Sequence, residues 1–292
     1  HVPILWVLLF YFMTGLWIWK KNGQNRHIRI SLAYVIMIIL IWIPMARRKS
    51  LAFLDVGQGD CFVADTKSGA IIFDGGSSSE DQVGRYRILP YMKYLGYQKI
   101  QIAVISHMDI DHYSGIKELL EMGKIKYLGL PEIPKDETMK KIIGIAKKRG
   151  TTIFYLSRGR QITTKDGSLK VLHPQKNSQM EKNAASLVMQ GKILGYRVLL
   201  TGDVEKEGEE ELLSEELERA DILKAAHHGS KNSTSNEFLQ KVQPKQTVIS
   251  CGKQNRYGHP HLETIHRLQT YHTKIYRTDR SGAIIFFKRR DG

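Results

Sequence analysis

The sequence has 292 residues with a formal net charge of +15, which is enough length for one buried core and a short appendage. The charge favours a polyanionic partner, either nucleic acid or anionic lipid, and does not choose between them. Only two cysteines occur, Cys61 and Cys251, which excludes a disulfide framework and a cysteine-rich zinc site. We expect both to be ordinary buried thiols. Because the first residue is His1, we also expect the sequence to be a piece of a longer protein.

Two apolar segments at the start of the chain predict membrane helices. Residues 2–19 and residues 30–46 contain no charged side chain, and tryptophans lie near their ends. Each segment has about the length that a helix needs to cross the hydrocarbon layer. The alternative is a pair of buried helices in a soluble core. No basic region precedes the first segment, so we do not expect a secretory signal peptide.

The predicted organisation is two membrane helices within residues 1–49 and one globular domain over residues 50–292. The loop between the two predicted helices carries four Lys or Arg residues, and the segment 47–49 after the second helix carries three. The positive-inside rule needs an asymmetry in Lys and Arg, so the sequence does not fix which side of the membrane the domain occupies.

From residue 50 onward, short apolar runs broken by Gly and Asp predict a sheet-rich domain. Residues 51–55 and 61–64 predict a hairpin around Gly57-Gln58-Gly59, and residues 77–87 predict a loop. Helices are predicted over 89–95, 115–122, 138–149, 205–218 and around 265–268. Further strands are predicted over 70–73, 102–105, 152–156, 169–172, 186–189, 197–201, 222–226, 247–250 and 283–287.

Three strand ends carry side chains that bind metals. The apolar run 102–105 leads into His107-Met108-Asp109-Ile110-Asp111-His112, with two histidines and two carboxylates in six residues. The run 197–201 ends in Gly202-Asp203, and the run 222–226 ends in His227-His228. Imidazole nitrogen and carboxylate oxygen hold divalent cations, and a solvated loop is the alternative for any one motif taken alone. Three such strand ends together predict a metal site.

These motifs resemble the metallo-β-lactamase superfamily. Within it, the opening segment 54–60, the turn 74–76 and the closing segment 257–260 resemble the C-terminal domain of the ComEC family, membrane proteins of DNA uptake in natural transformation. The resemblance runs from about residue 51 to the end of the chain. It implies an α/β fold of four αββα layers with two metals at one edge.

The resemblance also implies a setting. The two predicted helices would be late helices of a multi-pass channel protein in the cell membrane, with the globular domain outside the cytoplasm. The implied partners are DNA, single- or double-stranded, the membrane, the DNA-uptake machinery and the rest of the channel protein.

Two neighbouring cations need a shared oxygen ligand and further ligands on each side. By position in the motifs we assign Asp203 as the bridge, His107 and Asp109 to one metal, and Asp111, His112 and His227 to the other. His228 is the alternative to His227, because adjacent strand residues point to opposite faces and the register is not fixed. The resemblance implies that Asp74 orients a ligand histidine, whereas a plain turn residue is the alternative.

The sequence departs from the superfamily pattern in two places. Asp109 stands where many members have a histidine. His173 is the one histidine between the first motif and Gly202-Asp203; we interpret it as a polar residue ahead of a proline turn rather than as a ligand. A site short of nitrogen and rich in carboxylate favours two manganese ions, with zinc as the alternative.

The predicted activity is hydrolysis of a phosphodiester. Asp111 would orient the attacking water as well as bind a metal, and His259 would donate a proton or hold a phosphate, unless it is a structural histidine in a turn. The leading hypothesis is a membrane-tethered, metal-dependent DNase that degrades the strand not imported during DNA uptake. One alternative is a metallo-hydrolase of a small ester, thioester or lactam. Another is a non-catalytic DNA-binding or gating domain of a channel.

Overall fold

The computed structural model describes residues 4–19, 31–32, 34–35, 48–180 and 183–289. The chain divides into two compact units, His1–Arg48 and Lys49–Gly292. In the first unit, α1 spans Ile4–Trp19. Within the described residues, no helix is both long enough and apolar enough to cross a bilayer. The second predicted membrane helix, residues 30–46, lies mostly outside the described residues, so membrane spanning stays a prediction.

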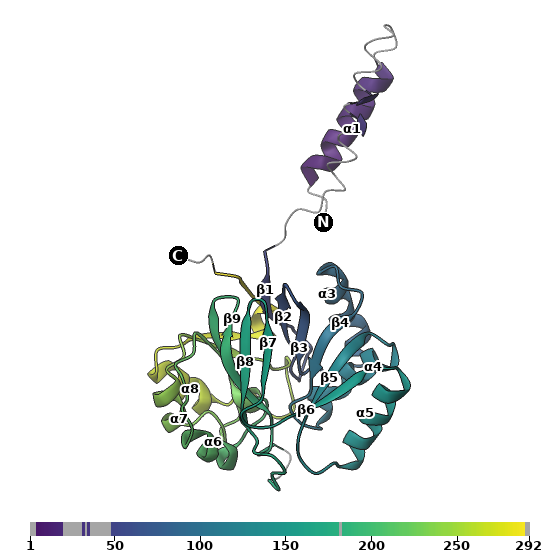
Figure 1. Cartoon of the computed structure of the whole chain (residues 1–292). Helices are drawn as coiled ribbons and strands as arrows, with labels where there is room; N and C mark the ends of the chain where they lie inside the picture. The colour runs from purple at the N-terminus through teal and green to yellow at the C-terminus, as the bar shows by residue number, and fades with distance from the viewer. Residues whose placement is uncertain (1–3, 20–30, 33, 36–47, 181–182, 290–292) are drawn as a thin grey trace. The chain divides into compact units, whose positions relative to one another are not determined.

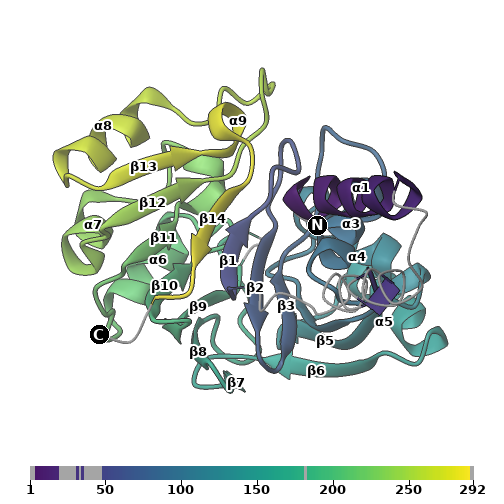
Figure 2. The ribbon, with the colours of Figure 1, turned by 90° about the horizontal axis from the view of Figure 1, so that it is seen from above.

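The second unit contains two seven-stranded mixed sheets (Figures 1 and 2). The first sheet has the order β14 (Ile284–Phe287), β1 (Ser50–Phe53), β2 (Phe62–Thr66), β3 (Gly69–Phe73), β4 (Ile100–Val104), β5 (Ile125–Pro131) and β6 (Thr152–Leu156). The second has the order β13 (Lys274–Arg277), β12 (Gln246–Ile249), β11 (Ile222–Lys224), β10 (Tyr196–Leu200), β9 (Val188–Ile193), β8 (Gly167–His173) and β7 (Gln161–Thr164). From β3 to β6 and from β10 to β13 neighbouring strands run parallel, so their carboxyl ends meet at one edge of each sheet.

Helices cover the outer face of each sheet (Figure 1). The first sheet packs against α3 (Leu89–Tyr94), α4 (Ile110–Glu121) and α5 (Glu137–Lys148), and the second against α6 (Lys206–Leu213), α7 (Asn236–Val242) and α8 (Leu262–Thr270). Alternate strand residues enter different cores, as the twofold side-chain period of a strand requires. In β3, Ile72 packs toward the helices, whereas Ile71 and Phe73 pack between the sheets. The result is the predicted αββα order of layers.

Several boundaries differ from the predictions. A short π-helix, η1 (Gly84–Ile88), lies in the segment predicted as a loop, and α6 ends eight residues after it begins, well before residue 218. Helix α4 begins at Ile110 rather than at residue 115: Asp109 has extended backbone, and its carbonyl oxygen accepts the first helical hydrogen bond, from the N–H of Tyr113 at 3.1 Å. Asp111 and His112 therefore project from the first turn of a helix.

The glycine turns after β1 and β3 allow a close backbone approach to this helix. A Cβ atom at Gly76 would lie 2.5 Å from the carbonyl oxygen of Ile110, and one at Gly59 would lie 2.7 Å from that of Asp111. The backbone N–H of Asp60 donates to the Asp111 carbonyl at 3.0 Å, and that of Gly75 donates to the His112 carbonyl at 2.8 Å. The two turns thereby fix where the first turn of α4 starts.

Candidate metal centre

The candidate metal centre lies where strands of both sheets end. Asp74 follows β3, and His107 follows β4 after a two-residue connection. From the second sheet, Asp203 follows β10, and the paired histidines follow β11 in a short 3₁₀ turn, η2 (Ala226–Gly229). The sheets thus bring together residues more than 150 positions apart in the sequence.

Four buried side chains, Asp60, His112, Asp203 and His228, place ligand atoms within 4.8 Å of one another. The Nε2 atom of His112 lies 3.1 Å from Oδ1 of Asp203, and the Nε2 atom of His228 lies 3.4 Å from Oδ2 of the same carboxylate. Asp111 faces the same group, with Oδ2 3.4 Å from His228 Nε2. Asp203 therefore lies between two imidazoles, one from each half of the domain.

In both imidazoles, the ring nitrogen that points away from Asp203 is held by a hydrogen bond. The Nδ1 atom of His112 donates to Oδ2 of Asp74 at 2.9 Å, and the Nδ1 atom of His228 donates to the carbonyl oxygen of Ser250 at 2.9 Å. The other Asp74 oxygen accepts from the backbone N–H of Ser106 at 2.7 Å. Because Nδ1 carries the proton in both rings, Nε2 faces Asp203 as the ligand atom. Asp74 stands in the orienting position that the resemblance implies.

Lys224 is a buried cation within this group. Its Nζ atom donates to the carbonyl oxygen of Gly202 at 2.8 Å, contacts a carboxylate oxygen of Asp60, and lies 3.5 Å from Oδ1 of Asp203. The Asp60 carboxylate also lies 3.7 Å from Nδ1 of both His112 and His228. The sequence motifs assign no role to Asp60 or Lys224. A lysine inside a predicted apolar strand is a signal that could have pointed to Lys224 as a buried charge.

The buried polar atoms of the centre fit a divalent cation. Six of them make no hydrogen bond of regular geometry, although Lys224 contacts one of the Asp60 oxygens: Nε2 of His107, His112 and His228, both carboxylate oxygens of Asp60, and Oδ1 of Asp203. Buried polar atoms are rarely left without a partner in a folded protein. Since these are imidazole nitrogens and carboxylate oxygens that face one another, a divalent metal would satisfy several of them at once.

Charges within the group shift several protonation equilibria. Burial opposes the charged form of His228, but Asp203 and Asp60 outweigh burial and raise its pKa to about 10. The same balance, with Asp203 and Asp74, raises the pKa of His112 above its usual range. Burial disfavours ionised Asp111, yet His228 and His112 lower the pKa of this carboxyl group to about 2. Without metal, protons supply the positive charge that balances the carboxylates.

The other two residues of the first motif lie beside this group. The Nε2 atom of His107 lies 3.5 Å from Oδ2 of Asp109, and the His107 ring centroid lies 4.1 Å from that of His112. The Nδ1 atom of His107 is 3.0 Å from Oγ of Ser106. His107 and Asp109 therefore face each other next to the cluster, in a position where they would bind a second cation.

The paired histidines differ in their surroundings. Both adopt left-handed backbone conformations, with φ of 47° at His227 and 52° at His228, so the alternation of strand side chains that we used to weigh the two histidines does not apply. The sharp turn buries His228, whereas the His227 side chain is 23% exposed. Nδ1 of His227 bonds Oε1 of Glu205 at 2.7 Å, and its Nε2 lies 3.8 Å from Asp203. His228 is thus more buried than His227 and is the histidine of the pair that belongs to the four-residue candidate cluster.

The two remaining histidines considered in the sequence, His259 and His173, lie outside the four-residue cluster. The His259 ring is stacked on the His228 ring at 6.1 Å, and burial together with the charges of His228 and His227 lowers its pKa to about 4. His173 is tied to the Ala184 carbonyl at 2.7 Å and lies 2.9 Å from Glu211. His173 is thus held by protein groups away from the cluster.

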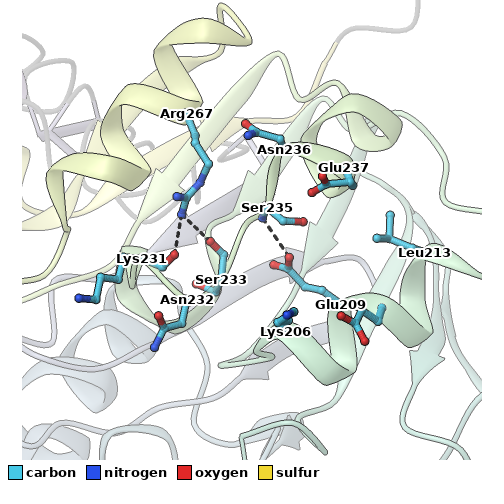
Figure 3. A pocket seen from close by; sticks show the side chains of 11 residues that line it. Lys206, Glu209, Leu213, Lys231, Asn232, Ser233, Ser235, Asn236, Glu237 and Arg267 are labelled. Atoms are coloured by element: carbon cyan, nitrogen blue, oxygen red, sulfur yellow. Dashed lines mark hydrogen bonds between the residues drawn. The ribbon is translucent and has the colours of Figure 1, made fainter.

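A polar cavity of about 470 Å³ adjoins the loop that follows the paired histidines (Figure 3). Glu209 and Arg267 build its wall: the Glu209 carboxylate accepts from the backbone N–H groups of Thr234 and Ser235, and Arg267 donates to the Lys231 and Ser233 carbonyls. The rest of the lining comprises Lys206, Glu210, Leu213, Asn232, Asn236 and Glu237.

Sequence comparison finds relatives among competence proteins. The chain is 35% identical to ComE operon protein 3 of Bacillus subtilis (strain 168) over 294 residues, which covers 94% of this chain and 38% of that protein. It is 30% identical to competence protein ComA of Neisseria gonorrhoeae, over 82% of this chain and 32% of the relative. Recombination protein 2 of Haemophilus influenzae is 27% identical, over 90% of this chain and 32% of the relative. The chain therefore spans less than two fifths of the length of these relatives.

Solved structures share the fold. YhfI of Bacillus subtilis, a metallo-β-lactamase fold protein, aligns with a TM-score of 0.54 at 13% identity, over 81% of this chain and 99% of that one. CmlA, a diiron β-hydroxylase from Streptomyces venezuelae, aligns with a TM-score of 0.53 at 10% identity, over 94% and 59%. The family model of the metallo-β-lactamase superfamily matches residues 54–253. With this match over most of its length, and with this fold, the chain belongs to the metallo-β-lactamase superfamily.

Proposed function

We propose that the chain is a membrane-tethered, metal-dependent DNase that degrades the non-imported strand during DNA uptake. The observation that carries this proposal is the buried group of His112, Asp203 and His228, whose ligand atoms face one another and several of which, Nε2 of both histidines among them, make no hydrogen bond of regular geometry. Such a group fits a hydrolytic metal centre rather than a structural salt bridge, because a structural network satisfies its buried polar atoms.

Two divalent ions fit the formal charge of the centre. Asp203 would bridge them, with Asp111, His112 and His228 on one side and His107 and Asp109 on the other. Five carboxylates bind or surround the proposed ions, those of Asp60, Asp74, Asp109, Asp111 and Asp203, and the ammonium of Lys224, which contacts Asp60 and lies 3.5 Å from Asp203, balances one of them. Two divalent cations balance the remaining four charges. Asp109 stands where many superfamily members have a histidine, and the larger share of oxygen ligands that results favours manganese, with zinc as the alternative.

When bound, such ions lower the pKa of a water molecule and stabilise charge that develops on the phosphate. Asp111 contributes the carboxylate that orients the attacking water, since burial keeps it near the cluster and its low pKa keeps it ionised at neutral pH. His259 holds the phosphate through a ring N–H. Its pKa of about 4 leaves the ring neutral at pH 7, which favours this role over proton donation.

DNA as the substrate is supported by charge and by relatives. The formal net charge of +15 favours a polyanion, and the relatives are named as competence and recombination proteins. The apolar segments 2–19 and 30–46 support a multi-pass location in the cell membrane. By analogy with the competence proteins, we place the globular domain outside the cytoplasm, next to the rest of a channel and the uptake machinery.

The test uses the full chain in detergent, stripped of metal, with end-labelled single- and double-stranded DNA. Manganese, zinc, magnesium or chelator is added, and Asp203→Asn is measured beside the wild type. Cleavage that requires metal and disappears in the variant supports the proposal. DNA that binds without being cleaved under any metal would instead favour the gating domain.

A further inference from the structure

A row of three rings leads from solvent to the candidate metal centre. Tyr257 is 44% exposed, and its ring is stacked against that of His259 at 5.7 Å with an interplanar angle of 22°. His259 in turn is stacked on the buried His228 at 6.1 Å with an angle of 30°. The row therefore connects an exposed aromatic ring with a buried histidine of the candidate centre.

Arg256 extends the row at its exposed end. Its guanidinium carbon lies 4.9 Å from the centroid of the Tyr257 ring, and its Nη2 atom donates to the Tyr257 hydroxyl at 2.7 Å. The pKa of Arg256 is raised by this hydrogen bond and, to a smaller extent, by the charge of Asp111. A flat cationic group and an aromatic ring thus lie together at the exposed end of the row that reaches His228.

The loop that carries these residues is held in place. The side-chain amide of Asn255 donates to the carbonyl oxygens of Gly252 at 2.9 Å and His259 at 2.6 Å, while its oxygen accepts from the His259 N–H at 2.9 Å. Gly258 has a φ of +71°, which lets the chain turn between Tyr257 and His259. The Tyr257 ring contacts the Arg256 guanidinium and the His259 ring, so the surface offered to a base is the guanidinium plane together with the exposed part of the ring. Because the loop is ordered before any ligand arrives, the entropic cost of binding is reduced.

We infer that Arg256 and Tyr257 form a stacking platform for the base that flanks the scissile phosphate. This inference rests on the proposed function and specifies its substrate: an unpaired nucleotide of a single strand or a frayed end. Exposed aromatic rings beside a cation bind single-stranded nucleic acid by stacking on the base, whatever its sequence. Bases inside a duplex already stack on their neighbours, so their faces cannot contact Tyr257.

The test measures binding rather than cleavage. The metal-free full chain is titrated with three fluorescent probes: a thymidine oligonucleotide, an abasic oligonucleotide of the same length and charge, and a duplex. We expect the wild type to bind the thymidine strand about tenfold more tightly than the abasic strand. Tyr257→Ala should lose this preference, whereas Tyr257→Phe, which keeps the ring, should retain it. Tyr94→Ala, at another exposed tyrosine, should leave the preference unchanged.

Equal affinity of the wild type for both strands would overturn the inference, as would a preference that survives Tyr257→Ala. Unchanged manganese binding by Tyr257→Ala confirms that the variant is folded. Because the measurement needs no metal, it is independent of the nuclease assay. A base preference without cleavage would refute the proposed DNase but support the stacking platform. Cleavage without a base preference would support the DNase but refute the platform.

Discussion

Lys224 is buried with its ammonium between the carboxylates of Asp60 and Asp203. It contacts Asp60, donates to the Gly202 carbonyl at 2.8 Å and lies 3.5 Å from Asp203. Burial alone would disfavour the charged lysine, but the two carboxylates outweigh burial and raise its pKa. The cation therefore connects the turn after β1 with the residue proposed to bridge the metals.

Replacing this cation should destabilise the metal-free protein. Lys224→Met keeps the length of the side chain but removes the cation that contacts the buried Asp60 carboxylate, which costs about 3–5 kcal/mol in the free energy of unfolding. Urea unfolding followed by circular dichroism measures this change. The double variant Lys224→Met, Asp60→Leu also removes the carboxylate and should recover most of the loss. Equal stability of Lys224→Met and the wild type would contradict the ion pair.

The two adjacent histidines should differ in their effect on metal binding. His228→Gln removes the buried Nε2 that lies 3.4 Å from both Asp203 and Asp111, so manganese affinity should fall at least tenfold. His227→Gln changes a partly exposed ring held by Glu205 and should reduce affinity much less. Electron paramagnetic resonance of free manganese gives both dissociation constants. A larger loss for His227→Gln would restore the original assignment of His227 as the ligand.

Asp74 should act on the metal through His112. Asp74→Asn weakens the hydrogen bond that holds Nδ1 of His112, and changes of this kind typically cost 10–100-fold in metal affinity. Asp65→Asn is the matched control, since Asp65 is also fully buried but bonds Lys49 and Tyr97 instead. Isothermal titration with manganese compares the two. Equal affinities for both variants would show that Asp74 has no special role at the centre.

Metal binding should release protons at neutral pH. The pKa of His228 is raised to about 10 and that of His112 is also raised, so both rings are charged at pH 7 in the metal-free protein. A cation that binds Nε2 must displace those protons. The apparent manganese affinity should therefore rise by about tenfold per pH unit for each proton released between pH 6 and pH 8. An affinity that does not change over this range would contradict the shifted pKa values.

The same shifts predict the acid and alkaline behaviour of the metal-free protein. The raised pKa of His228 stabilises the folded state fully below pH 6.5, and this contribution is lost as the pH rises through about 10. The lowered pKa of Asp111 stabilises it above pH 3.8, and that contribution is lost as the pH falls through about 2. Unfolding curves between pH 7 and pH 10 should show falling stability without manganese. A flat profile would argue against the charged His228.

The sequence predicted those parts of the fold that local chemistry determines. The hairpin around Gly57-Gln58-Gly59, helix α5 and the strands that end near Asp74, Asp203 and His227 follow from apolar runs bounded by glycine and aspartate. Helix α7 and strands β5, β7 and β13 were not predicted, because their apolar residues are few or interrupted by lysine and threonine and their burial depends on neighbouring strands.

The candidate site was predicted less completely, for two physical reasons. The choice between His227 and His228 depends on a left-handed turn at non-glycine residues, which no residue in that segment indicates. Asp60 and Lys224 meet only because β2 and β11 belong to different sheets that pack face to face. A motif shows which residue types are available, whereas the partner of a buried charge comes from the tertiary fold.

The most direct test of the account is a manganese titration of the metal-free full chain in which bound metal and DNA cleavage are measured on the same samples. We predict that two manganese ions bind and that cleavage of single-stranded DNA appears as the second is bound, with none in Asp203→Asn. A protein that binds both ions and cleaves neither single- nor double-stranded DNA would contradict the proposed nuclease.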